Sequence, residues 1–438
     1  MCRQYRKEEA AMGNFWIPLL VLAVTFIIGL PIALDLICSA VIYLMYCHMD
    51  IGIVAEQICQ SMIANYTILA VPMFVLMAEL MNGSSISNKL FDFCKGCIGK
   101  RRGALAYVNV MISLIFSGMS GSAVADASGI GLIEVKAMKD DGYDAAFSAA
   151  ITSATSTVGP IIPPSIPFVI YSTISGASVG ALFLGGIVPG IILCGFLAGY
   201  VWWISKKRNY PMGHSYTGKE FLRFTLGALP ALFTIVILFA GIYGGVMTPT
   251  EAGAVAALYA MLIALFVYRT IDLKGIIKAL RSTALQTGTI TIMTAASVVM
   301  SYMVAKEGVS KAIAAWVLSL TSNKYLLFFV IDVIFLFLGM LLDVSVLQYV
   351  FVPLVLPIVT ALGINLVHFG VVIVLNMMIG LSTPPFGMCL FISSSISGAK
   401  LSEVSKEILP MCAVLIVVLL IMTYCPALVT WFPHLCGF

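Results

Sequence analysis

The sequence is poor in charge. Asp, Glu, Lys and Arg make up 10% of its 438 residues, whereas 61% are hydrophobic and the mean hydropathy is +1.06. Soluble domains carry about 25% charged residues, so this composition excludes an ordinary soluble enzyme or binding domain. The net charge is only +4, and the basic residues are spread through connecting segments, which argues against nucleic-acid binding. The sequence therefore predicts an all-α polytopic membrane protein in contact with the lipid bilayer.

Metal-binding and catalytic motifs are also missing. The four histidines are scattered at the ends of apolar runs and form no H-E-x-x-H motif. Five cysteines lie in apolar runs without C-x-x-C spacing or histidine neighbours: Cys38, Cys59, Cys194, Cys389 and Cys412. An intramembrane protease would need a serine with a base or two aspartates on facing helices. We therefore expect no metal centre of this kind, no organic cofactor and no enzymatic activity.

Basic side chains are absent from two long stretches. No Lys or Arg lies between Arg102 and Lys136, or between Lys324 and Lys400. An anionic substrate bound there must meet hydroxyls, helix N-termini or bound cations. Half-helix N-termini carry about half a positive charge, and unwound carbonyls suit Na⁺.

The same two stretches contain the main breaks in the apolar sequence. Residues 116–167 contain the glycine-rich run SGMSGSA and the proline-rich run GPIIPPS, and residues 339–387 contain GMLLDVS and LSTPPFG. Irregular backbone is tolerated at membrane depth only where it faces protein or a wet cavity. Two interrupted segments at corresponding places in two halves indicate the substrate site of a secondary transporter.

The hydropathy pattern also predicts the helices. We expect helices over 15–29, 32–47, 50–65, 69–81, 182–204, 226–247, 251–268, 284–304 and 408–431, hairpins over 104–135 and 325–362, broken helices over 145–173 and 369–395, and amphipathic connections over 84–103 and 269–281. If 89–102 is cytoplasmic, most basic residues are cytoplasmic and both termini face outward. The halves then form inverted repeats with two re-entrant hairpins. A start at Met12 would make residues 1–11 an extension.

Several candidate residues allow a structural alternative. Small residues in the two clusters serve helix packing as readily as binding. Asp343 is a cation ligand or a structural cap, and Asp126 caps a helix or lines the site. Glu251 follows Thr250, which we expect to be the N-cap of a helix. The acidic residues Glu79, Asp35 and Asp332 have no assignable partner in the sequence.

Long segments of the sequence resemble one known family. The runs FSGMSGSAVADASGIG, GYDAAFSAAITSATSTVGPIIPPSIPFVIYSTISGASVG, MTPTEAGAVAALYA, LGMLLDVSVLQYVFVPLVLPI and HFGVVIVLNMMIGLSTPPFGMCLF resemble the large membrane (M) subunit of tripartite ATP-independent periplasmic (TRAP) transporters. The resemblance covers residues 12–431. It implies an elevator-type fold of the ion transporter superfamily, in which a transport domain moves against a scaffold.

The resemblance further implies function and partners. A Na⁺ gradient, with two or more Na⁺ ions, would drive import of an organic acid such as a sialic acid or C4-dicarboxylate across the bacterial inner membrane. A periplasmic substrate-binding (P) protein would deliver the acid, and a separate small four-helix membrane (Q) subunit would complete the complex. The alternatives are a stand-alone Na⁺/dicarboxylate symporter of the same superfamily and a channel.

Domains and sites follow from the resemblance as expectations. The scaffold would comprise 12–103, 181–324 and 399–438, and the transport domain would comprise 104–180 and 325–398. One Na⁺ site would use Ser117, Gly118, Gly121, Thr155 and Gly159, and another would use Gly339, Asp343, Gly380 and Thr383. The substrate would contact Ser120, Ser122, Pro163, Ser345 and Pro384.

Overall fold

A computed structural model describes residues 16–64, 66–84, 86–308 and 323–438. The expected N-terminal extension, residues 1–11, lies outside this range. The described chain is helical throughout, and its only β pairing is an isolated bridge between Arg102 and Met212. This confirms the predicted all-α class.

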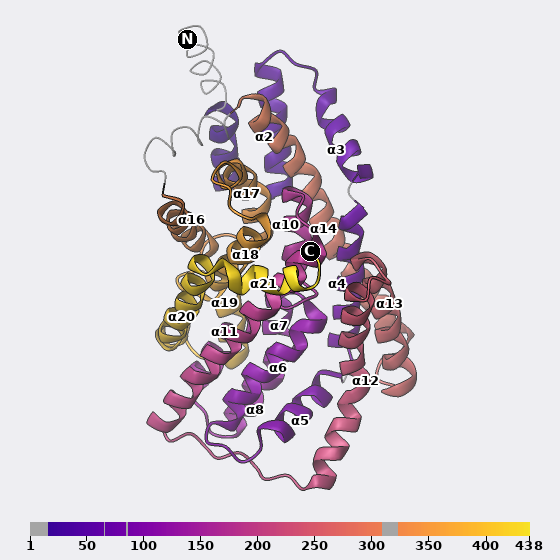
Figure 1. Ribbon diagram of the computed structural model, residues 1–438, viewed down its shortest axis with the longest axis vertical. Coiled ribbons are helices and arrows are strands. Elements are labelled where there is room, and N and C mark those ends of the chain that lie inside the picture. Colours follow the sequence, from indigo (N-terminus) through magenta and orange to yellow (C-terminus); the bar gives the residue numbers. More distant parts are fainter. Residues whose placement is uncertain (1–15, 65, 85, 309–322) are drawn as a thin grey trace.

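The helices form two groups that run side by side along the long axis of the molecule (Figure 1). In the framework group, α13 packs on α4, α12 on α5, and α14 on α2, α3 and α4. Its members are α2 (Ile32–Tyr46), α3 (Gly52–Ala64), α4 (Ala70–Asn82), α5 (Ile86–Ile98), α12 (Gly218–Tyr243), α13 (Pro249–Leu262) and α14 (Leu273–Lys306).

The hairpin group contains the two predicted hairpins and the two broken helices. Its members from the first half are α6 (Ala104–Ser120), α7 (Ala123–Ser128), α8 (Ile130–Asp140), α9 (Ala145–Ser156), α10 (Ile166–Ser175) and α11 (Val179–Lys207). Those from the second half are α16 (Lys324–Gly339), α17 (Val344–Ala361), α18 (Leu366–Ser382), α19 (Met388–Ser397), α20 (Leu401–Tyr424) and α21 (Pro426–Leu435). Helices α11 and α20 pack on each other, α20 packs on α9, and both pack on α18.

Within the described residues, six helices are long and apolar enough to cross a membrane. They are Val179–Lys207, Gly218–Tyr243, Pro249–Val267, Leu273–Lys306, Val344–Ala361 and Leu401–Tyr424. A bent pair, Tyr66–Asn82 with Ile86–Ile98, passes the same test as one span. Shorter apolar helices, including Trp16–Ile28, account for much of the remaining chain.

Three sequence predictions at helix boundaries are wrong. The basic connection 269–281 is not separate, because α14 runs unbroken from Leu273 through it. The single closing helix 408–431 is two helices, divided at Cys425, where the following Pro426 disfavours helical backbone. The N-cap before Glu251 is Thr248, whose hydroxyl oxygen accepts from the Glu251 N–H while the Glu251 carboxylate accepts from the Thr248 N–H.

The predicted breaks lie where glycine and proline occur. Helix α6 ends at Gly121, which has φ of 61°, and its Cα lies so close to the Pro164 carbonyl that a Cβ would be 2.5 Å from that oxygen. The first broken helix is interrupted between Ser156 and Ile166, and the second between Ser382 and Met388. The hairpin turns and the helix breaks therefore meet inside the hairpin group.

Candidate functional site

A cavity of about 120 Å³ lies where the two hairpin turns approach each other. Ser122 enters it from the first hairpin, and Asp343 and Ser345 enter it from the second. The remaining walls are Gly121, Ala123, Val124, Pro160, Ile166, Pro167, Ile170, Gln286, Ile290, Val344, Met378 and Leu381. None of these described lining residues is Lys or Arg, so the cavity offers hydroxyls, backbone, one amide and one carboxylate.

The first hairpin places a buried carboxylate beside the first helix break. Asp126 is 1% exposed, and its Oδ1 accepts a hydrogen bond from the Ser120 hydroxyl. Its Oδ2 has no hydrogen-bond partner among the described residues and lies 2.5 Å from where a Cβ on Gly159 would be. Since a buried carboxylate oxygen without a partner is unfavourable, a cation at this position would stabilise it.

Thr155 is turned away from that carboxylate. Its hydroxyl donates to Asn109 Oδ1 at 2.6 Å, and Asn109 Nδ2 donates to the Thr152 hydroxyl at 2.7 Å. The Thr155 side chain therefore belongs to a buried polar chain that joins α6 and α9.

Two other residues of the first predicted Na⁺ site make contacts of their own. The Ser117 hydroxyl donates to the Leu114 carbonyl at 2.6 Å, a bond within its own helix. Gly118 faces α12, since a Cβ there would lie 3.1 Å from Ile235 Cδ1. The structure thus brings Gly121 and Gly159 to the turn and the break, whereas Gly118 lies between the two helix groups.

The turn of the second hairpin meets the second broken helix at two glycines, where backbone touches backbone. A Cβ on Gly380 would lie 2.6 Å from the carbonyl carbon of Gly339. Asp343 is the N-cap of α17, and its Oδ1 accepts from the Ser345 N–H at 2.8 Å. The Thr383 hydroxyl donates to the Ile379 carbonyl at 2.6 Å and faces Cys412 of α20. Both oxygens of Thr383 therefore have partners at the break, since its carbonyl accepts from the Gly387 N–H at 3.2 Å.

The predicted substrate residues are only partly brought together. Ser122 and Ser345 line the cavity, whereas Ser120, Pro163 and Pro384 do not. The Ser120 hydroxyl is used by Asp126, and Pro163 and Pro384 each precede a second proline at a helix break, in a cis peptide bond.

Sequence analysis missed one contributor to this region. Gln286 of α14 lines the cavity, and its Nε2 donates to Glu79 Oε1 of α4 at 2.6 Å. The sequence predicts that Asp126 caps a helix or lines the site, and the structure places its carboxylate beside Ser120 and Gly159. An acidic residue in an apolar run was the signal for Glu79 and Asp126, but no signal marked Gln286.

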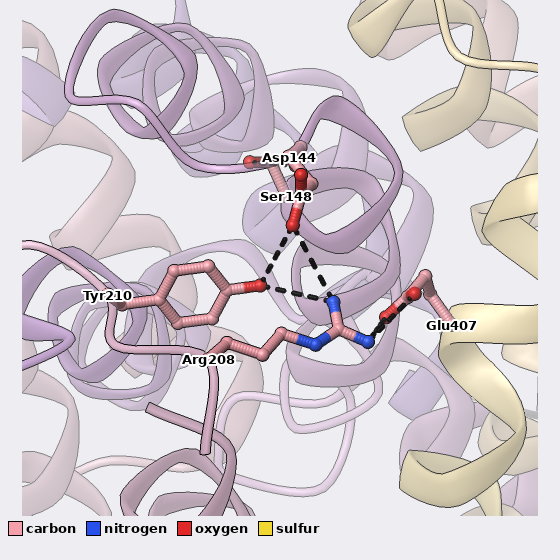
Figure 2. A network of polar contacts seen from close by, with 5 residues as sticks. All are labelled: Asp144, Ser148, Arg208, Tyr210 and Glu407. Carbon is pink, nitrogen blue, oxygen red and sulfur yellow. Dashed lines mark hydrogen bonds and ion pairs between the residues drawn. The ribbon is translucent and has the colours of Figure 1, made fainter. Parts of the chain in front are cut away.

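At one end of the hairpin group, a polar network joins its two halves (Figure 2). The Arg208 guanidinium, just after α11, contacts Glu407 of α20 at 2.8 Å and Asp144, the N-cap of α9, at 3.6 Å. Tyr210 accepts from Arg208 at 3.2 Å and donates to Asp144 at 3.3 Å.

Arg208 and Tyr210 of this network titrate far from neutral pH. Hydrogen bonding to Glu407 raises the pKa of the Arg208 guanidinium above its usual value. Burial raises the pKa of the Tyr210 hydroxyl. Arg208 therefore stays charged and Tyr210 stays neutral at physiological pH, so the network holds α9, α11 and α20 together there.

Comparisons with known proteins agree with this architecture. Residues 19–428 match the profile of the tripartite ATP-independent periplasmic transporter, DctM component. The chain is 38% identical over 408 residues to the sialic acid TRAP transporter large permease protein SiaM of Vibrio cholerae, covering 93% of this chain and 95% of that one. It is 34% identical over 377 residues to the C4-dicarboxylate TRAP transporter large permease protein DctM of Pseudomonas aeruginosa, covering 85% and 87%.

A solved structure shows the same fold at low sequence identity. The Alcanivorax borkumensis YdaH transporter superposes with a TM-score of 0.63 at 13% identity, covering 97% of this chain and 98% of that one. This likeness concerns the fold alone. The relatives above are named as transporter permeases rather than enzymes. The family profile spans most of the chain and the relatives share a third or more of its residues, so this protein belongs to the family of TRAP transporter large permease subunits.

Proposed function

We propose that this chain imports an organic acid across the bacterial inner membrane by Na⁺-coupled secondary active transport. The observation that carries the proposal is the cavity between the two hairpin turns, which joins Ser122, Asp343 and Ser345 from both halves of the chain. Substrate sites of inverted-repeat transporters lie at such junctions, and relatives are named for sialic acid and C4-dicarboxylates.

Coupling to a cation follows from the charge of the site. The carboxylates of Asp343 and Asp126 lie at or behind the hairpin turns, and no described lining residue is basic. An anionic substrate would be repelled unless cations bound first. We propose one Na⁺ near Asp126 and the backbone at Gly121 and Gly159, and a second near Asp343 and the backbone of Gly339, Gly380 and Thr383.

The proposed movement is that of an elevator. The hairpins and broken helices, 104–180 and 325–398, would carry the substrate past the framework group. Packing of α11 and α20 on α9 and α18, together with the Arg208 network, supports adding these two helices to the moving unit.

The proposed complex has two further proteins. A periplasmic substrate-binding protein would deliver the acid, and a small four-helix membrane subunit would accompany the framework group. The topology proposed from the basic residues places both termini in the periplasm.

The test is uptake into proteoliposomes that contain this chain and the small subunit. Labelled sialic acid and succinate are supplied with an inward Na⁺ gradient, with and without the binding protein. Uptake that requires both Na⁺ and the binding protein supports the tripartite mechanism. Equal uptake without the binding protein would assign a stand-alone symporter, and uptake that does not saturate and ignores Na⁺ would indicate a channel.

A further inference from the structure

One wall of the cavity comes from the framework group. Gln286 and Ile290, one turn apart on α14, line the cavity, whereas its other described lining residues come from the hairpin group. Gln286 supplies the only polar side chain on this wall within the described part of the chain. A substrate held between the hairpin turns therefore faces a single polar group of the framework.

The orientation of the Gln286 amide is fixed by its neighbours. Nε2 lies 2.6 Å from Glu79 Oε1 and 3.2 Å from the Ser282 hydroxyl. A carboxylate only accepts hydrogen bonds, so the NH₂ end of the amide must face Glu79. Both amide hydrogens then have partners, and Oε1 accepts from no described residue. Gln286 thus presents a hydrogen-bond acceptor, backed by a carboxylate.

The opposite side of the cavity also carries an acceptor. Asp343 Oδ1 accepts from the Ser345 N–H, and the rest of its carboxylate adjoins the cavity. The Ser122 oxygen accepts from the Ala125 N–H at 3.3 Å, which leaves its hydrogen free to donate to a substrate oxygen. The cavity therefore combines hydroxyl donors for one carboxylate with acceptors that suit substrate O–H or N–H groups.

A second carboxylate on the substrate would fit poorly. It would approach the Gln286 carbonyl with Glu79 behind it, and no described lining residue supplies a positive charge. An acceptor placed against an acceptor leaves both groups without a hydrogen bond, which weakens binding strongly.

We infer that Gln286, held in place by Glu79, selects the substrate by accepting a hydrogen bond from its hydroxyl or amide group, so that this chain prefers a hydroxylated monocarboxylate to a C4-dicarboxylate. The inference rests on the proposed function, because it assumes that the cavity is the substrate site. Gln286 would contact the substrate, and Glu79 is a positioning residue.

The test measures binding by the chain itself, without a binding protein that selects the acid first. Purified full-length chain in detergent is titrated with N-acetylneuraminate or succinate, in NaCl and in choline chloride, and the thermal unfolding midpoint is followed. A ligand that binds the folded state stabilises it by RT ln(1 + [L]/Kd), so a fit of the midpoint against ligand concentration gives the half-saturating concentration. We expect Na⁺-dependent stabilisation that is stronger with N-acetylneuraminate.

Substitutions of Gln286 test how much its side-chain amide contributes to substrate binding. Gln286→Leu should raise the half-saturating concentration of N-acetylneuraminate by about threefold to tenfold, the effect of one hydrogen bond, and leave that of succinate unchanged. Gln60→Leu is the matched control, because Gln60 donates to Glu56 at 3.2 Å in an exposed pair like that of Gln286 and Glu79, but outside the cavity. Gln286→Asn shortens the side chain and withdraws its amide from the cavity. It replaces Gln286→Leu if the leucine variant does not fold, and the same change in half-saturating concentration is measured.

Glu79→Gln tests the positioning role. A glutamine at position 79 can donate as well as accept, so the Gln286 amide is free to turn and to present its NH₂ to the cavity. We expect the unliganded unfolding midpoint to change little and the preference for N-acetylneuraminate over succinate to fall. A residue with a purely structural role would change the midpoint without changing this ratio.

The outcomes separate the inference from the proposed function. Stronger binding of succinate than of N-acetylneuraminate by the unmodified chain, or equal effects of Gln286→Leu and Gln60→Leu, would overturn the inference alone. Absence of Na⁺-dependent stabilisation by both acids would overturn the proposed function together with the inference.

Discussion

Gly339 and Gly380 meet backbone to backbone, where the second hairpin approaches the second broken helix. A Cβ on Gly380 would lie 2.6 Å, 2.7 Å and 2.9 Å from the carbonyl carbon, Cα and carbonyl oxygen of Gly339. Real Cβ contacts are not this short, and backbone atoms cannot rotate out of the way as a side-chain tip can. This close approach holds the second hairpin turn against the break that it faces.

Gly380→Ala should therefore separate α16 from α18 and abolish uptake. Gly199→Ala is the matched control, because a Cβ on Gly199 of α11 meets nothing within 4 Å, and alanine in a helix is more favourable than glycine by up to about 1 kcal/mol. Unfolding midpoints in detergent and uptake in proteoliposomes are measured for both. Normal uptake by Gly380→Ala would show that the close approach is dispensable.

Asp126→Asn should weaken Na⁺ binding at the first proposed site. The change removes the charge of a buried carboxylate whose Oδ2 has no described partner, and it keeps the shape of the side chain. Loss of one charged ligand is worth about 1.5–3 kcal/mol, so the Na⁺ concentration for half-maximal uptake should rise by about tenfold or more. An unchanged Na⁺ dependence in folded protein would remove Asp126 from the site.

Thr383→Ala should raise the Na⁺ concentration for half-maximal uptake by less than Asp126→Asn, with membrane insertion intact. The Thr383 hydroxyl donates to the Ile379 carbonyl and faces Cys412, so its loss would disturb the helix break rather than remove a direct ligand. Na⁺ titrations of uptake compare the two variants. A larger effect of Thr383→Ala would mean that the hydroxyl itself binds the cation.

Asn109→Ala should lower the stability of the hairpin group. Asn109 is fully buried and is hydrogen-bonded to Thr155 and Thr152, so its removal leaves buried hydroxyls without their partners as well as a small void. The expected loss is about 1–3 kcal/mol of unfolding free energy. Thermal unfolding in detergent measures it, with Thr360→Ala as an exposed control whose hydroxyl bonds only within its own helix.

Arg208→Met and Glu407→Gln should be coupled by only about 0.5–1 kcal/mol in a double-mutant cycle. The two side chains are 33% and 23% exposed, and partly exposed ion pairs are screened by solvent. Unfolding free energies of the two single variants and the double variant give the coupling. Additive single effects would show that the network in Figure 2 is not energetically linked across the two halves.

The sequence predicts the interruptions of the helices better than the contacts between distant residues. Helices are interrupted at Gly121, at the Pro163–Pro164 pair and at the Pro384–Pro385 pair, because the backbone preferences of glycine and proline act locally. The sequence predicts a separate connection where α14 begins, because the first turns of this helix carry the charged residues Lys274 and Lys278.

Contacts between distant residues could not be predicted in this way. Gln286 reaches the cavity only because α14 packs on α4 and α17, which hydropathy cannot foresee. Glu79, Asp35 and Asp332 had no assignable partners, and the structure gives each one: Gln286 for Glu79, Thr25 for Asp35, and Asn376 with Thr423 for Asp332. Side-chain direction, as at Thr383, depends on tertiary packing in the same way.

Gly118 determines how closely the two helix groups approach each other between α6 and α12. At this point α6 presents bare backbone to the branched tip of Ile235 on α12. The Ile235 tip occupies the space that a side chain at position 118 would need, so α6 and α12 approach closely here. A bulky residue at position 118 would push the two helix groups apart at this point.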